Sequence, residues 1–348
     1  MSVSQQFGEI GAVFTVEPML PEAENLINLA VAQSPDGITL AIGRRLVRAA
    51  EKGKLDTQSD ITELAAVAWD GSGQLISNQV LTTPQKIGNN TIRTFEDLRM
   101  VQTSLGQWAL GGTDVVTKIG ADGGWETHPA IFETTFEELL AGRLPEPYVV
   151  EAIQMPPGES AETHGKNMTP IGKEDLWLFR PDGTENNHRL HVVRYDGTEA
   201  VHAQFIDLPT DLPWAQHKLG TTGPPIWINE REAIFPLHGM NLIDGVYVYA
   251  IGAARLSIDD EGLLHIDHIS RTPLIHPDHF IDPASKIQDV ELHAERRVVY
   301  VSAMIQEVGD DGVHYVSMFV NVGDKKSVKV KIPQDQLTQG WASADLTR

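Results

Sequence analysis

The sequence contains no cysteine, so disulfides, thiolate metal sites and cysteine nucleophiles are excluded. Basic residues are also few, with 27 Lys and Arg against 48 Asp and Glu, a formal net charge of -21. Nucleic acids and anionic membranes require a basic surface, so neither is expected as a partner. No apolar run is long enough to span a bilayer, and the segment Met1–Ile10 is polar rather than signal-like. A cytoplasmic protein is therefore expected.

What is present is typical of a large globular protein, with 41% hydrophobic and 22% charged residues. A length of 348 residues fits either two domains or one large all-β domain, and we predict a single domain over 1–348. Strand–turn–strand patterns recur, with β-branched and apolar residues on both sides of Gly- or Asp-containing turns. These hairpins are expected over 63–80, 97–116, 188–208, 245–269 and 296–322.

Hairpins spread over the whole chain indicate a radial array of small antiparallel sheets. The repeats are inexact, so the pattern alone does not fix the number of sheets. Helical signals are few. The best is Thr134–Ala141, with a threonine cap, acidic residues in the first turn and Gly142 as a stop, placed in a connection between sheets. The Pro- and Gly-rich segment 144–165 is equally typical of a domain linker and of another such connection.

The first motif with possible chemistry is Phe95–Arg99, which leads into a strand. Glu96 and Asp97 stand beside Arg99. One carboxylate of such a pair can be held by the arginine while the other stays free to titrate, and that arrangement can make a general acid. The alternative is a solvated turn before a strand.

Basic residues form the second motif. Lys166-Asn167 and Arg180-Pro181 stand at strand ends, where an arginine suits bidentate contacts to phosphate or carboxylate. The alternative is a surface salt bridge to one of the 48 acids.

The third motif is a loop, Gly220–Pro225, followed by a strand that ends near His238. A Gly- and Pro-rich loop lets the backbone approach a ligand closely, but it lacks the lysine and spacing of a P-loop. The alternative is that His238 has a structural role only. Histidine pairs three residues apart lie on opposite faces of a strand, so no metal site is expected from them.

The order of these motifs resembles glycoside hydrolase family 130, whose members are five-bladed propellers acting on β-mannosides. Glu96-Asp97-Leu98-Arg99 is similar to the family's Glu-Asp-Pro-Arg motif, with leucine in place of proline. The family's next landmarks are a Pro-Pro segment, a basic residue with Asn or Asp, a strand ending in Arg-Pro, a Gly-Pro-Pro loop and a strand ending in His-Gly. Their counterparts follow in the same order: Pro156-Pro157, Lys166-Asn167, Arg180-Pro181, Gly223-Pro224-Pro225 and His238-Gly239.

The sequence departs from that family at both ends. The family's N-terminal Asn-Pro is absent, and Asn25 or Asn28 is a poor substitute, although Arg44 matches the arginine that follows. In the last blade, Ser302-Ala303-Met304 stands where the family has Ala-Ala-Asp, and no aspartate replaces the sugar-binding one. The resemblance is therefore to a distant member or to a sister group such as glycosyltransferase family 108.

The resemblance implies an all-β, five-bladed β-propeller that splits a β-mannoside with phosphate, with inversion, to give α-mannose 1-phosphate. Asp97 would be the general acid, acting in the family by way of a sugar hydroxyl. Phosphate would be bound by Lys166, Arg180 and His238. The substrate would be contacted by Arg44, Glu96, Arg99, Asn167 and Tyr249. The implied partners are a mannose-containing oligosaccharide and inorganic phosphate as co-substrate, with no metal or other cofactor. A homo-oligomer is left open.

Three alternatives belong to other classes. A mannoside hydrolase needs a second carboxylate to activate water, whereas a phosphorylase needs only the acid. The candidates for that second carboxylate are Glu126, Glu151 and Glu162. A mannosyltransferase would pass the sugar to another acceptor. A non-catalytic sugar-binding propeller would keep the cleft without turnover.

Overall fold

The computed structural model describes most of the chain, and its elements are almost all strands. The described residues are 14–24, 26–48, 61–87, 91–103, 106–118, 124–151, 153, 155, 164–181, 187–280, 296–323, 326–338 and 341–343. Helical turns within them are short: α2 (Pro21–Glu24), α3 (Phe136–Leu140), η2 (Pro277–Phe280) and η3 (Gln334–Thr338). None of these is long or apolar enough to cross a membrane.

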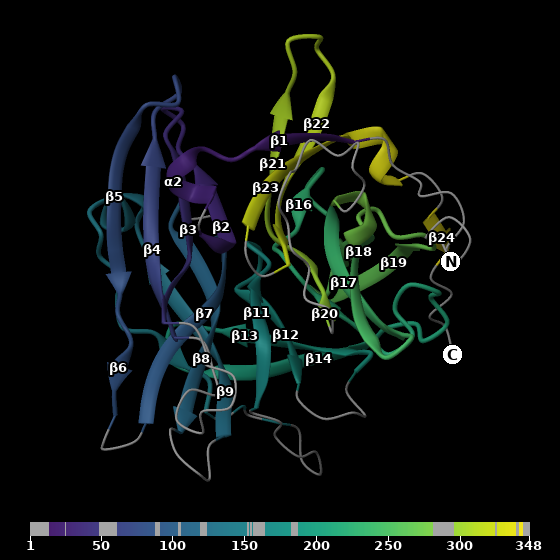
Figure 1. Ribbon diagram of the computed structural model, residues 1–348. Helices are drawn as coiled ribbons and strands as arrows, with labels where there is room; N and C mark the ends of the chain where they lie inside the picture. Colours follow the sequence, from purple (N-terminus) through teal and green to yellow (C-terminus); the bar gives the residue numbers. More distant parts are fainter. Residues whose placement is uncertain are drawn as a thin grey trace.

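The described strands form five sheets, antiparallel except for the short β18–β20 pair, which we call blades I to V (Figure 1). Blade I has the order β2 (Ile27–Gln33), β3 (Thr39–Arg48), β4 (Ile61–Trp69) and β5 (Leu75–Thr82). Blade II has the order β6 (Gln85–Lys86), β7 (Thr91–Gln102), β8 (Trp108–Lys118), β9 (Gly124–Thr134) and β10 (Tyr148–Val149). Blade III has the order β11 (Gly165–Pro170), β12 (Leu176–Pro181), β13 (Arg189–Tyr195) and β14 (Ala200–Asp207).

Blade IV is the largest sheet. It follows the order β15 (Lys218–Thr221), β17 (Glu232–Ile243), β18 (Val246–Ile258), β19 (Leu264–Ser270) and β24 (Trp341–Ser343). Two short strands, β16 (Ile226–Trp227) and β20 (Arg296–Arg297), pair with β17 and β18. The five hairpins predicted from the sequence are confirmed as β4–β5, β7–β8, β13–β14, β18–β19 and β21–β22.

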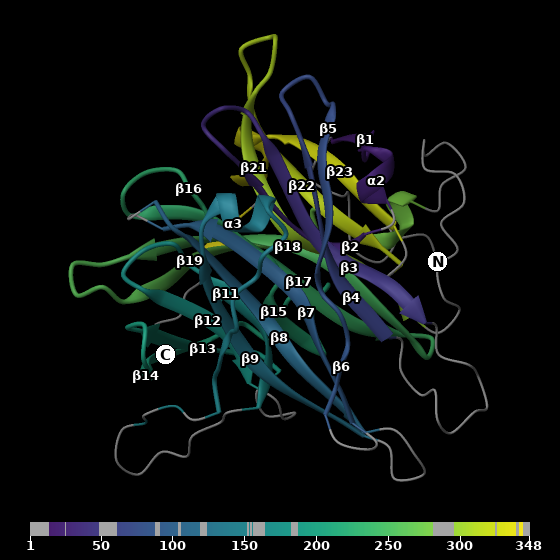
Figure 2. The same cartoon turned by 90° about the vertical axis from the view of Figure 1, so that its left-hand side faces the viewer.

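Blade V joins the two ends of the chain. It consists of β21 (Val299–Val308), β22 (His314–Val322), β23 (Lys326–Pro333) and, from the N-terminal region, β1 (Thr15–Pro18). In Figures 1 and 2 the purple β1 runs beside the yellow strands of this blade, and its register pairs Thr15 with Lys331. The early and late parts of the sequence are thus held in one sheet.

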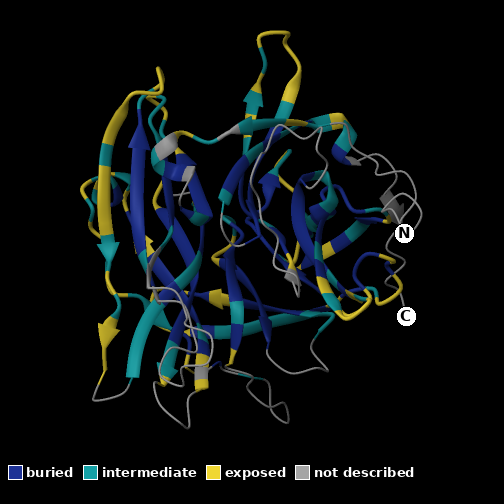
Figure 3. Cartoon of the chain, viewed as in Figure 1, coloured by how far each residue is buried: buried dark blue, intermediate teal, exposed yellow. Residues whose placement is uncertain are grey.

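The apolar core is divided among the five junctions between neighbouring blades. Strand β4 shows the reason, because successive side chains of a strand point to opposite faces. Ala66 packs in the cluster between blades I and II, whereas Ala65 and Val67 pack between blades I and V. Three further clusters fill the II–III, III–IV and IV–V junctions, which closes the ring. Strands that are buried on both faces therefore have nearly continuous apolar sequences. Figure 3 shows the inner strands buried and β5 largely exposed.

The structure is an all-β, five-bladed β-propeller, as predicted. The predicted helix is confirmed as α3, whose cap Thr135 accepts a hydrogen bond from the Glu138 amide at 3.2 Å. Its predicted place between blades is wrong, because α3 lies between β9 and β10 of one sheet.

Candidate active site

Three neighbouring blades each bring one residue with unusual backbone geometry towards the centre of the ring. Asn28, Asp97 and Asn167 have φ angles of 54°, 55° and 65°, in the left-handed region. Each sits where the pairing register of its strand shifts, on β2, β7 and β11. Among residues with a side chain, Asn and Asp adopt this conformation most readily, and bulges of this kind re-aim a side chain.

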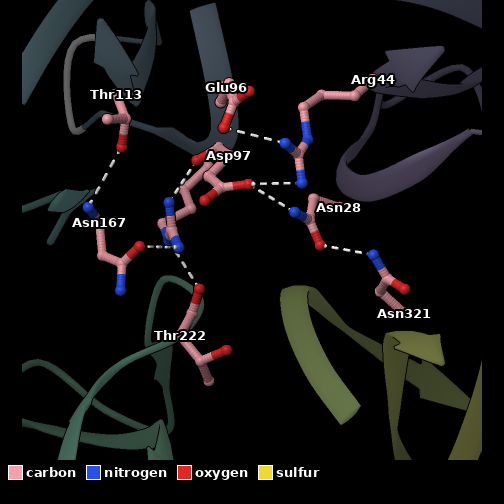
Figure 4. Close-up of polar contacts among 9 residues, drawn as sticks. Asn28, Arg44, Glu96, Asp97, Thr113, Asn167, Thr222 and Asn321 are labelled. Atoms are coloured by element: carbon pink, nitrogen blue, oxygen red, sulfur yellow. Dashed lines mark hydrogen bonds and ion pairs between the residues drawn. The ribbon is translucent and has the colours of Figure 1, made fainter. Parts of the chain in front are cut away.

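The Asp97 carboxylate is the centre of the polar cluster in Figure 4, and 19% of its side chain is exposed. Its Oδ1 accepts a hydrogen bond from the Asn28 amide and lies 3.3 Å from Nη2 of Arg44. The other end of the same guanidinium lies 2.9 Å from Oε2 of Glu96. The expectation that one carboxylate of the pair stays free is therefore wrong, because Arg44, rather than Arg99, holds both.

Asp97 is ionised at neutral pH. Burial raises the pKa of its carboxyl, but Arg44, Arg99 and Lys166 lower it, as does the Asn28 hydrogen bond. The net effect is a pKa below the ordinary value. A proton on Asp97 must therefore arrive with a ligand or from a change in the surrounding charge.

Arg99 is fully buried beneath this cluster, with no exposed surface. Its Nε donates to the main-chain oxygen of Thr222 at 2.6 Å, and its Nη2 donates to Oδ1 of Asn167 at 3.1 Å. Nη1 donates to the main-chain oxygen of Asp97. The guanidinium also lies over the Tyr300 ring, 5.3 Å from its centroid. Arg99 thus ties blades II, III, IV and V together rather than facing solvent, which differs from the predicted substrate contact.

Burial lowers the pKa of Arg99 to about 10, with Asp97 opposing and Arg44 and Arg180 assisting the shift. The guanidinium therefore still carries its charge at neutral pH. A buried charge of this kind is tolerated because its donors are satisfied.

A chain of two amides fixes Asn28 in front of Asp97. Asn321, on β22 and 1% exposed, donates from Nδ2 to Oδ1 of Asn28 at 2.7 Å. Because the Asn28 oxygen is occupied, its amide nitrogen faces Asp97 (Figure 4). Sequence reasoning did not single out Asn321, and it considered Asn28 only as a poor substitute for the family's Asn-Pro motif. The signal in the sequence was weak, an asparagine within an apolar strand in each case.

The second and third motifs meet on the other side of the cluster. Lys166 and Arg180 are cross-strand partners on β11 and β12, and Arg180 is 6% exposed. A Cβ placed on Gly220 would lie 3.4 Å from Cδ of Arg180 and 3.3 Å from Cε1 of His238. Arg180 and His238 therefore pack together over Gly220, where a side chain larger than glycine's would crowd them.

His238 is 3% exposed and is held in a fixed orientation. Its Nδ1 lies 2.8 Å from the main-chain oxygen of Thr221. Tyr249 stacks on the imidazole with 6.3 Å between centroids, and the Tyr300 ring lies 5.4 Å away. Burial, with help from Arg180, lowers the pKa of His238 to about 3, so the ring is neutral at physiological pH. The structure thus gathers every predicted site residue around the Asp97 cluster.

Several other predicted features lie elsewhere. Glu126 is in an exposed ion pair with Lys118 at 2.7 Å, and Glu151 is exposed. Glu162, Asn25 and the Pro156-Pro157 segment lie outside the described residues. Ser302, in place of the family's aspartate, is completely buried at a register shift in β21. Glu126 therefore does not supply a second carboxylate at the cluster, and position 302, where the family has aspartate, has no carboxylate to supply.

No family model matches the sequence, and no curated protein is similar to it. Among solved structures, an α-L-arabinofuranosidase from Lactobacillus brevis aligns with a TM-score of 0.53 and 8% identity, over 90% of this chain and 92% of that chain. A glycosyl hydrolase from Bacteroides ovatus has a TM-score of 0.49 and 12% identity, over 89% of this chain and 84% of that one. A GH43 β-1,3-galactosidase has a TM-score of 0.49 and 11% identity, over 89% and 90%. At these identities the likeness establishes the propeller fold alone.

Proposed function

We propose that this protein is a carbohydrate-active enzyme, an inverting β-mannoside phosphorylase whose reaction takes place at the Asp97 cluster. One observation carries the proposal. In a chain of net charge -21, four cationic side chains gather around two carboxylates. They are Arg44, Arg99, Lys166 and Arg180. Cations concentrated against the overall field are suited to an anionic substrate such as phosphate. The fold shared with a structure named as an arabinofuranosidase supports a sugar as the other substrate.

The reaction balances without a cofactor. An oxygen of hydrogen phosphate attacks the anomeric carbon from the face opposite the leaving group, and the bond from that carbon to the leaving oxygen breaks. The β-mannoside becomes α-mannose 1-phosphate. One proton passes to the released alcohol, and the phosphate group loses its own proton to solvent after the transfer, so the protons balance. Lys166 and Arg180 bind the phosphate oxygens, and His238 completes that subsite.

Asp97 moves the proton. In the free protein its pKa is held down by nearby cations, Lys166 among them. A bound phosphate dianion offsets this positive charge, which raises the pKa of Asp97 and makes protonation possible. Asp97 then acts as general acid towards the leaving oxygen. Phosphate thus supplies the nucleophile and the electrostatic change, and solvent supplies the proton that Asp97 passes on.

The remaining residues bind and position the substrate. Arg44 and Glu96 are partly exposed, with 14% and 21% of their side chains accessible, and their polar atoms suit sugar hydroxyls. Asn167 and Tyr249 are the remaining proposed substrate contacts. Arg99 orients Asp97 and Asn167 from below. We propose that the enzyme acts in the cytoplasm on a mannose-containing oligosaccharide, without a metal or organic cofactor.

A hydrolase is the second candidate, because a specific contact favours it. Glu96 and Asp97 share one guanidinium, so two carboxylates stand together at the site, and an inverting hydrolase uses two.

The test is incubation with mannose 1-phosphate and a panel of acceptors, including mannose and N-acetylglucosamine, with released phosphate as the measurement. Wild-type protein is compared with Asp97→Asn, and Asp207→Asn, at an exposed ion pair with Arg189, serves as the matched control. Release that Asp97→Asn abolishes supports the phosphorylase. Hydrolysis of β-mannosides in phosphate-free buffer, with no phosphate release from mannose 1-phosphate, would establish the hydrolase instead. Sugar binding without either activity would contradict both.

A further inference from the structure

We infer that His238 presents a hydrogen-bond acceptor, not a donor, to the anion site, and so selects hydrogen phosphate over tetrahedral dianions that carry no proton, such as sulfate. The inference rests on the proposed function in one respect, namely that a phosphate binds beside Lys166 and Arg180. It goes further by naming the protonation state that the site recognises and the atom that recognises it.

The tautomer of His238 follows from one contact. Nδ1 lies 2.8 Å from the main-chain oxygen of Thr221. A carbonyl oxygen only accepts hydrogen bonds, so Nδ1 must carry the hydrogen. A neutral imidazole has one N–H, which leaves Nε2 with a lone pair.

The surroundings keep the ring neutral. His238 is 3% exposed, between Tyr249 and Tyr300, with the Arg180 side chain close by above Gly220. Burial and the charge of Arg180 lower its pKa to about 3, so a second proton does not bind near neutral pH. Within the described part of the chain, Nε2 has no hydrogen-bond partner. His238 and the Arg180 stem pack over the same face of Gly220, whose missing Cβ would lie 3.8 Å from Nε2 and 3.4 Å from Cδ of Arg180, so Nε2 lies beside the cationic side chain.

An acceptor beside two cations distinguishes anions that are alike in charge and shape. Lys166 and Arg180 attract phosphate and sulfate equally. Hydrogen phosphate, the main species at slightly alkaline pH, has one O–H to donate to Nε2, whereas sulfate has none. A sulfate oxygen would face the lone pair, leaving two acceptors opposed in a buried position. A mismatch of this kind weakens binding by roughly tenfold to a hundredfold.

The test is calorimetric binding of phosphate, arsenate and sulfate to the whole protein at pH 7.5. Arsenate is the matched probe, because it is also protonated at this pH. Wild-type protein is expected to bind phosphate and arsenate at least tenfold more tightly than sulfate. In His238→Gln, whose side-chain amide can turn its NH₂ group to the ligand, this ratio should fall towards one. Arg180→Gln is the control, expected to weaken all three anions while keeping the ratio.

Equal affinity of wild-type protein for sulfate and phosphate would overturn the inference, whether or not phosphorolysis is observed. Selective binding of phosphate and arsenate without any phosphorolysis would support the inference and count against the proposed function. Failure to bind any of the three anions would contradict both. A selectivity unchanged in His238→Gln, with the variant folded as judged by circular dichroism, would place the discrimination on another residue and also overturn it.

Discussion

Blades I to III and blades IV and V contribute to the centre of the ring in different ways. The first three each place an Asn or Asp in a left-handed bulge, and the cations Arg44, Lys166 and Arg180 come from the same blades. Blades IV and V supply main-chain oxygens, aromatic rings and neutral side chains. Their central contact joins the hydroxyl of Thr222 to the Val301 oxygen at 2.6 Å. Blades I to III, the charged half, therefore carry the side chains suited to a reaction. Blades IV and V, the neutral half, hold those side chains in place.

The largest effect is expected in the charged half. We predict that Asp97→Asn lowers phosphate release by about a hundredfold to ten-thousandfold, because a general acid is removed. Folding should be retained, since asparagine tolerates the left-handed φ of 55°. Circular dichroism and thermal unfolding check the fold. Full activity in this variant would show that Asp97 is not the general acid.

Arg99 links the two halves, and we predict that Arg99→Met lowers the free energy of unfolding by about 3 to 5 kcal/mol. The methionine fills space but leaves the acceptors on Thr222, Asn167 and Asp97 without their donor. Denaturant unfolding measures the change. Arg189→Met is the control, because its ion pair with Asp207 is exposed and should contribute under about 1 kcal/mol. Similar losses in both variants would contradict the linking role.

Acid should destabilise the protein through its buried histidines. The pKa values of His191 and His238 fall to about 3, and those of His276 and His279 to about 4, chiefly because of burial. An unfolded histidine titrates near 6.5, so the unfolded chain binds more protons below that pH. Stability is therefore lost as pH falls from about 6.5, by roughly 2 kcal/mol for each such histidine at pH 5.

Unfolding in urea across pH 5 to 7 measures this slope. His191→Gln should make it shallower, and the exposed His314 gives the control substitution, His314→Gln, which should leave it unchanged. A slope that does not respond to His191→Gln would show that this histidine is not the source.

The smallest effect concerns the amide chain from blade V. We predict that Asn321→Leu lowers kcat/KM about tenfold, because the Asn28 amide loses the donor that orients it. A turned amide would point its oxygen at Asp97 and raise the pKa of that carboxyl. Because Asp97 acts in its protonated form, the alkaline limb of the pH profile would shift upwards. Ser327→Ala is the control, since it removes a buried blade V hydrogen bond to Leu26 away from Asp97. Equal activity losses in both variants would indicate a structural role only.

The sequence by itself determined the strand content, most of the hairpins and the chemical types at the site. Apolar and polar residues alternate along strands, and turn residues stand between strands. Both are local properties, so they can be recognised without knowledge of the fold. Lys166, Arg180 and His238 could be singled out because basic residues next to Gly and Pro are conspicuous in an acidic chain. Their functional roles stay predictions.

Tertiary structure alone decided how these residues act. Asn28 and Asn321 are separated by 293 positions, and β1 pairs with β23 across the whole chain. Arg44, not the adjacent Arg99, holds the two carboxylates, because blade I lies against blade II and Arg99 turns inwards. Burial, ion pairing and the tautomer of His238 depend on neighbours brought together by ring closure. A linear pattern does not contain those neighbours, so it can name the residues of the site without giving their arrangement.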